Sequence, residues 1–195
     1  MQQTTLERVI SDIDFFNEDD PNKECNEIGQ WLSKEVLYSQ RMTQVLSDFE
    51  PNASPELQIA ARAQHMGRWL SARSDYPQGK AGYLNWRKDL GKKHAQLCQE
   101  ILEKHHVESS QQQRIAQLLR KERLNKDAEV QCLEDVICIV FVKHYLSDFA
   151  AKHDKDKLLS IIAKTWNKMS DKGHASILEL ELAAELKSVL LEALA

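Results

Sequence analysis

Apolar residues recur at the three- and four-residue spacing of an amphipathic helix along almost the whole chain. No stretch of useful length alternates between apolar and polar residues, as a half-buried strand would. Glycine and proline, which an α/β fold of this size needs for its turns, number only 6 and 4. The sequence therefore predicts an all-α fold, a multi-helix bundle of about seven or eight helices, with residues 1–195 forming a single helical domain.

The bulk composition restricts the partners that we expect. The formal net charge is −4 without a broad basic field, which makes nucleic acid an unlikely partner. No apolar run approaches the roughly 20 residues of a membrane span, and residues 1–14 do not resemble a signal peptide. The cysteines form no C-x-x-C pair and suit a reducing compartment. We expect a cytoplasmic protein with no membrane partner, and the sequence leaves the oligomeric state open.

Local signals place the helices. Ser54 and Pro55 are typical of the cap and first position of a helix, and Asp127 and Asp154 are expected to cap two others. The longest irregular stretch is 71–83, and 168–173 is expected to end a helix at a glycine. The expected helices are 5–16, 33–49, 55–69, 84–105, 110–124, 128–150, 155–173 and 182–194.

Three polar residues on otherwise apolar helix faces predict a metal site. Glu134 and Asp135 interrupt the most apolar helix, where an unpaired carboxylate is costly. His94 lies on the apolar stripe of its helix, and His65 lies in an alanine-rich segment. Two histidines and a carboxylate suit a divalent metal ion such as Mn, Fe, Zn or Mg, so we expect His65, His94 and Asp135 as ligands. The alternative is a set of satisfied core histidines and a structural ion pair.

Cations and aromatic residues interleave around the irregular stretch, and they suit a phosphate or carboxylate ligand that carries a flat group. We expect the partner to be a small anionic, phosphorylated molecule. The alternative is an ordinary solvated loop. We expect Glu134 to act as a general base or to orient a metal-bound histidine. Lys121 is a second catalytic candidate, although a surface charge run is the alternative for it. The expected substrate-binding residues are Arg68, Trp69, Arg73, Lys80, Tyr83 and Arg87.

Residues 37–69, 92–102 and 133–141 resemble domain-of-unknown-function family 4202, a similarity that covers nearly the whole chain and implies no established activity. More remotely, the order of the pieces resembles the HD superfamily of helical, metal-dependent phosphohydrolases. This resemblance implies an HD-like multi-helix bundle. His65 matches the histidine of that superfamily's His-Asp pair, and Asp135 matches its last aspartate. Met66 stands where the paired aspartate is expected, and Tyr38 or Ser39 stands where the first histidine is expected.

These observations lead to one functional hypothesis and its alternatives. The chain is expected to be a metal-dependent phosphohydrolase, in which the metal lowers the pKa of a bound water that attacks a small phosphorylated molecule. A metal-dependent oxygenase is a variant of this hypothesis. The first alternative is a catalytically inactive binding module for a nucleotide-like anion, and the second is a structural or interaction protein with a satisfied polar core.

Overall fold

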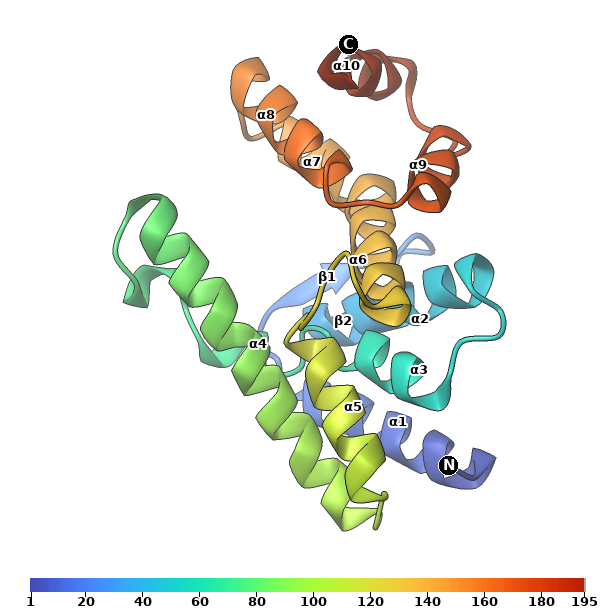
Figure 1. Ribbon diagram of the computed structural model, residues 1–195. Coiled ribbons are helices and arrows are strands. Elements are labelled where there is room, and N and C mark those ends of the chain that lie inside the picture. Colours follow the sequence, from blue (N-terminus) through green and yellow to red (C-terminus); the bar gives the residue numbers. More distant parts are fainter. Residues whose placement is uncertain (195) are drawn as a thin grey trace. The chain divides into compact units, whose positions relative to one another are not determined.

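The computed structural model describes residues 1–194, which contain ten α-helices and one small two-stranded sheet (Figure 1). The prediction of an all-α fold is therefore confirmed. Within the described residues, no helix has both the length and the apolar composition needed to cross a membrane. The chain divides into two compact units, Met1–Leu124 and Asn125–Ala195. The expectation of a single domain stays a prediction.

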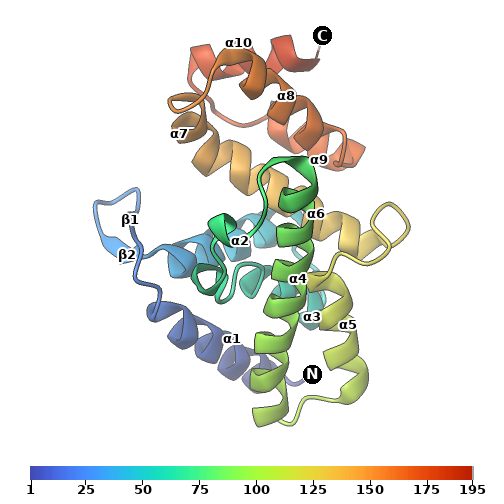
Figure 2. The ribbon, with the colours of Figure 1, turned by 90° about the vertical axis from the view of Figure 1, so that its left-hand side faces the viewer.

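The first unit is built on five helices that contact one another. Helix α3 packs against α1, α2 and α5, while α4, the longest helix, packs against α1 and α5. Figure 2 shows α4 and α5 running side by side. The elements are α1 (Gln3–Glu18), β1 (Lys23–Cys25), β2 (Trp31–Ser33), α2 (Lys34–Phe49), α3 (Pro55–Arg62), two short 3-10 helices (Arg68–Leu70 and Arg73–Asp75), α4 (Gly79–Lys104) and α5 (Ser109–Leu119).

A β-hairpin between α1 and α2 was not predicted. Its strands pair antiparallel with Lys23 opposite Ser33. The Oδ1 atom of Asn26 closes the turn by accepting from the backbone N–H groups of Ile28, at 3.1 Å, and Gln30, at 2.8 Å. Strands of three residues are too short to produce a recognisable alternation of apolar and polar residues.

Helix α3 is shorter than predicted, because it ends at Arg62 and not near residue 69. Gly67 has a φ of +67°, a left-handed conformation that a continuing helix does not contain. A Cβ at this position would lie 2.4 Å from Cδ1 of Leu97, so the backbone approaches α4 closely here. His65 consequently lies in the turn after α3.

The described part of the second unit, residues 125–194, contains five α-helices and one π-helical turn. Asp127 and Asp154 cap α6 and α8 by accepting from backbone N–H groups, as predicted. The prediction that one helix continues from 155 to a glycine at 173 was wrong, because α8 ends at Trp166 and Ser170 caps a new helix. The elements are α6 (Ala128–Val140), the π-turn Phe141–Tyr145, α7 (Leu146–Ala150), α8 (Lys155–Trp166), α9 (Asp171–Leu178) and α10 (Ala184–Leu194).

Candidate functional site: a basic cavity in the first unit

A cavity of about 420 Å³ lies within the first unit. The turn after α3, the middle of α4, and the end of α5 with the segment that follows it provide its walls. Six of its lining residues are cationic and one, Glu122, is acidic. The lining consists of Gln64, His65, Arg68, Arg87, Lys88, Leu90, Gly91, Lys92, His94, Leu119, Arg120, Lys121 and Glu122.

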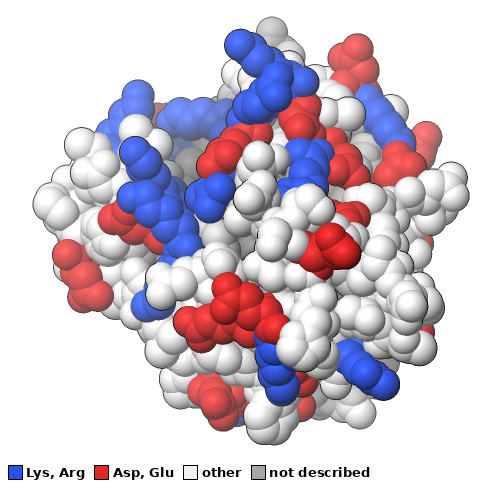
Figure 3. Space-filling model, turned by 60° about the horizontal axis from the view of Figure 1, so that its bottom comes forward, with Lys and Arg blue, Asp and Glu red and all other residues white. Residues whose placement is uncertain are grey.

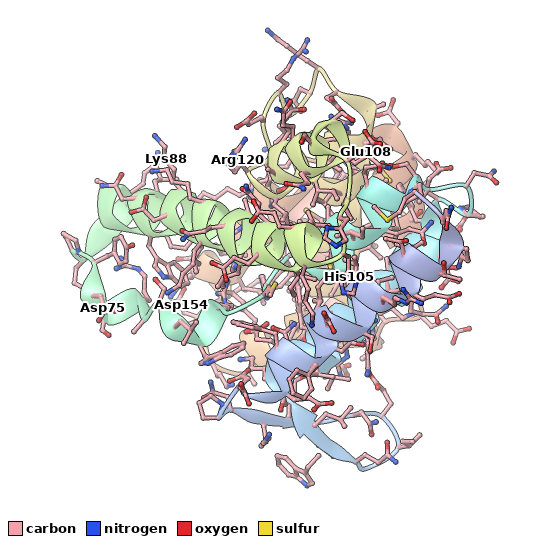
Figure 4. All side chains as sticks on the ribbon, turned by 90° about the horizontal axis from the view of Figure 1, so that it is seen from below. Asp75, Lys88, His105, Glu108, Arg120 and Asp154 are labelled. Carbon is pink, nitrogen blue, oxygen red and sulfur yellow. The ribbon has the colours of Figure 1, made fainter. Side chains whose placement is uncertain are left out.

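The cationic side chains come from segments distant in sequence. In Figure 4, Lys88 of α4 and Arg120, which follows α5, lie on the same side of α4. Figure 3 shows lysine and arginine side chains gathered beside a hollow on the face that comes forward in that view. The Nε atom of Arg120 donates to Glu122 at 2.6 Å, which offsets the one negative charge of the lining. The lining residues therefore carry an excess of positive charge, although the net charge of the chain is negative.

His65 is held between a buried carboxylate and an aromatic ring. Its Nδ1 lies 3.1 Å from Oε2 of Glu35 in the first turn of α2. The ring of Tyr38 stacks on the imidazole with centroids 3.7 Å apart and planes 11° apart. The Glu35 side chain is 5% exposed, and the His65 side chain is 16% exposed. With Glu35 ionised, Nδ1–H donates to the carboxylate and Nε2 keeps its lone pair.

Burial shifts the pKa values of Glu35 and His65 in opposite directions. Desolvation raises the pKa of Glu35 to about 7, against a smaller lowering by Arg68. Desolvation also lowers the pKa of His65 well below its ordinary value, and the positive charge of Arg68 lowers it further. Each group is thus driven toward its neutral form, which is the usual response of a charge removed from water.

Arg68 connects this pair to the cavity. Its Nη1 lies 3.4 Å from Nε2 of His65, and its Nε lies 3.9 Å from Oε1 of Glu35. The guanidinium lies over the ring of Trp86, with Cζ 4.9 Å from the ring centroid, in a cation–π contact. Trp86 is itself fixed, because its Nε1 donates to the carbonyl of Ser71 at 3.1 Å.

His94 lies deeper in the cavity wall and is 2% exposed. Its Nδ1 donates to the carbonyl of Met66 at 2.7 Å, which fixes the tautomer and leaves Nε2 unprotonated. Desolvation lowers the pKa of His94 to about 4, although the bond to Met66 acts in the other direction. The rings of His65 and His94 lie 6.2 Å apart, so the structure brings these two predicted residues together.

The other predicted substrate-binding residues divide into two groups. Arg68 and Arg87 line the cavity, whereas the remaining four do not belong to its lining. The guanidinium of Arg73 donates to the carbonyls of Tyr76, at 2.9 Å, and Pro77, at 3.0 Å, so it closes its own loop. The residues placed outside the lining are Trp69, Arg73, Lys80 and Tyr83.

Lys121, one of the two predicted catalytic residues, lines the cavity. It lies two residues after the end of α5, in a left-handed conformation with a φ of +54°. The peptide N–H of Lys121 donates to the carbonyl of Leu118 at 2.9 Å, so a tight turn fixes this segment. The turn places Lys121 in the wall of the cavity together with Arg120.

The predicted acids of α6 belong to the second unit and have partners within it. The carboxylate of Asp135 accepts from Ser170, from its N–H at 2.9 Å and its hydroxyl at 2.5 Å. The Nε2 atom of Gln131 donates to the same carboxylate at 3.1 Å. Glu134 lies 3.6 Å from Nζ of Lys168. These contacts explain how two carboxylates are tolerated in the most apolar helix.

The charges beside the two histidines bear on whether a metal cation could bind there. Among residues 1–194, no group of three or more histidine, cysteine, aspartate or glutamate side chains is arranged to hold a metal ion. Arg68 lies beside Nε2 of His65, and its positive charge opposes a cation there. A metal held jointly by His65, His94 and Asp135 stays a prediction, since Asp135 belongs to the other unit.

Glu35 is the functional candidate that the sequence prediction missed. It begins a stripe of buried residues at helical spacing, which continues with Ser39, Met42 and Leu46. That pattern contains a signal, because a carboxylate at the start of an inward-facing stripe needs a partner. The partner is 30 residues away along the chain, and this distance hides the pair in the sequence.

The fold and the cavity define a class: an all-α protein whose first unit contains a basic cavity with a glutamate–histidine pair in its wall. The family model described as "Domain of unknown function (DUF4202)" matches residues 7–190. The chain therefore belongs to this family, and the predicted family resemblance is confirmed. No curated protein and no solved structure matches the chain.

Proposed function

We propose that the first unit binds a small phosphorylated molecule in the basic cavity. The observation that carries this proposal is the gathering of Arg68, Arg87 and Lys121 around one cavity that also contains His65. Arginine and lysine form strong charge-assisted hydrogen bonds with phosphate oxygens. The volume of about 420 Å³ lies within the range of about 300–1,000 Å³ that is typical of small-molecule sites.

Isothermal titration calorimetry with inorganic phosphate and ADP tests this proposal. We expect Arg87→Ala to weaken ADP binding by roughly 10- to 100-fold, because a charge-assisted contact is lost. Arg8→Ala is the matched control, since Arg8 is an exposed arginine of α1 outside the cavity. Binding should also weaken as salt concentration rises. Equal weakening by the two substitutions, or no binding of either probe, would contradict a site in this cavity.

Hydrolysis of the bound molecule is the second candidate function. The observation that favours it is the buried Glu35 beside His65, since a carboxylate that orients a histidine is a common device for proton transfer. In the metal-dependent form of this proposal, His65, His94 and Asp135 hold a divalent ion. Metal analysis of the purified chain, with Asp135→Ala as control, tests that form directly.

A further inference from the structure

We propose that Glu35 and His65 form a general-base pair that hydrolyses a phosphoric anhydride bound in the basic cavity. This inference rests on the proposed binding of a phosphorylated molecule and assigns a reaction and a substrate class to the same site. The sequence did not point to Glu35, and the pair follows from the contact between α2 and the turn after α3.

The geometry gives each member of the pair a defined role. The Glu35 carboxylate accepts a hydrogen bond from Nδ1–H of His65, so the lone pair of Nε2 is available on the other side of the ring. Stacking on Tyr38 limits rotation of the imidazole. His65 lines the cavity, and its partly exposed ring can receive a proton from a molecule bound there. Glu35 is a positioning residue in this arrangement, and His65 is the group that contacts the attacking water.

Arg68 links substrate binding to the exposure of Nε2. The guanidinium lies 3.4 Å from this nitrogen, a long contact to a weak neutral acceptor. A phosphate oxygen is a stronger acceptor, because hydrogen bonds between ionised groups are about twice as strong as neutral ones. A bound phosphate therefore attracts Arg68 away from Nε2 and leaves room there for the attacking water.

Groups that line the cavity can account for each step of the proposed hydrolysis. The oxygen of a water molecule attacks the terminal phosphorus while Nε2 of His65 takes one proton from that water. The bridging P–O bond breaks, and its electron pair leaves with the departing phosphate, whose added charge Arg87 and Lys121 neutralise. The imidazolium then lies beside the Glu35 carboxylate, and the proton passes to solvent when the products leave.

The lining favours an anhydride over an alkyl ester. A phosphate leaving group has a second pKa of about 6, so it departs without taking a proton. An alkoxide needs a proton from an acid. The acidic residue of the lining, Glu122, accepts from Arg120, and His94 is neutral near pH 7 because burial lowers its pKa to about 4.

The pH dependence of kcat is expected to reflect the joint protonation of Glu35 and His65. Burial raises the pKa of Glu35 to about 7 and lowers that of His65, so the pair takes up one proton as the pH falls below neutrality. A pair that already carries this proton cannot accept another from water. We therefore expect kcat to fall as the pH falls below about 7. Glu35→Gln should shift this acidic limb to lower pH, since an imidazolium loses its neighbouring negative charge.

Phosphate release from ADP and inorganic pyrophosphate, with AMP as the ester comparison, tests the inference. We expect release from the anhydrides and little from AMP. His65→Gln should lower kcat roughly 100- to 10,000-fold, while the Kd of the non-hydrolysable α,β-methylene analogue of ADP changes less than about threefold. His106→Asn is the matched control, because His106 is exposed and outside the cavity lining. Helical circular dichroism and thermal unfolding confirm that each variant folds, and His65→Asn serves as a second substitution.

The outcomes separate the two proposals. Equal turnover by His65→Gln and the wild type, or an acidic limb that Glu35→Gln leaves in place, would overturn the general-base pair. Binding of the methylene analogue without phosphate release from any probe would also overturn it, while supporting the proposed binding function. Failure of the analogue to bind would instead refute the binding function on which the inference rests.

Discussion

Replacing Asp135 with alanine is expected to lower the free energy of unfolding by about 3 kcal/mol. Asp135 is 2% exposed, and its carboxylate accepts from the N–H and the hydroxyl of Ser170. Alanine removes both acceptors and leaves the start of α9 without its partner in α6. Because Gly173 also packs against this carboxylate, with a Cβ position only 2.8 Å from Oδ1, the substitution creates a void at the same place.

Urea unfolding, together with hydrogen exchange of the α9 amides, measures this effect. Asp148→Ala is the control, because Asp148 is an exposed aspartate of the same unit and should change stability by less than about 0.5 kcal/mol. If Asp135 serves chiefly as a metal ligand, stability without metal should remain almost unchanged in Asp135→Ala. A loss below about 1 kcal/mol would thus argue against the structural role and in favour of the metal hypothesis.

The features that the sequence predicted well have local causes. Asp127 and Asp154 cap helices by accepting from amides two or three residues further along the chain, so the signal and its effect lie side by side. The position of His94 on an apolar stripe was equally visible, and its burial follows from that position. The prediction that His65 lies near His94 came from such stripes, and the two rings are 6.2 Å apart.

The features that were missed depend on contacts distant in sequence. Helix α3 ends earlier than predicted, and Gly67 in the turn that follows it lies close to Leu97 of α4. No pattern within residues 55–69 indicates that contact. Ser170 begins a helix at a place where a glycine three residues later suggested an end, and its backbone N–H also bonds Asp135, 35 residues earlier. The pairing of Glu35 with His65 has the same origin. Local patterns thus predicted helices and burial, whereas the identity of each buried partner required the folded chain.

The stability of the first unit should depend on pH through His94. Burial lowers the pKa of this histidine from 6.5 to about 4, so below pH 6.5 the unfolded chain takes up a proton that the folded chain does not. The contribution of neutral His94 to the free energy of unfolding is therefore fully present above pH 6.5 and is lost as the pH falls toward 4. At roughly 1.36 kcal/mol per pH unit, the wild type should lose about 3 kcal/mol from this group.

A comparison with His94→Asn isolates this contribution, because an asparagine amide can donate to the Met66 carbonyl as Nδ1 of His94 does. The lowered pKa of His65, like that of His94, makes the folded state less stable as the pH falls. The pKa of Glu35 is raised to about 7, so this group makes the folded state more stable as the pH falls from 7 to 4.5. His65 and Glu35 remain in the His94→Asn variant, so their contributions cancel when the free energies of unfolding of the two proteins are subtracted. Urea unfolding at several pH values from 4 to 8 should show that the difference in stability changes by about 3 kcal/mol. His106→Asn should follow the wild type throughout, and parallel curves for His94→Asn and the wild type would mean that His94 is not buried in its neutral form.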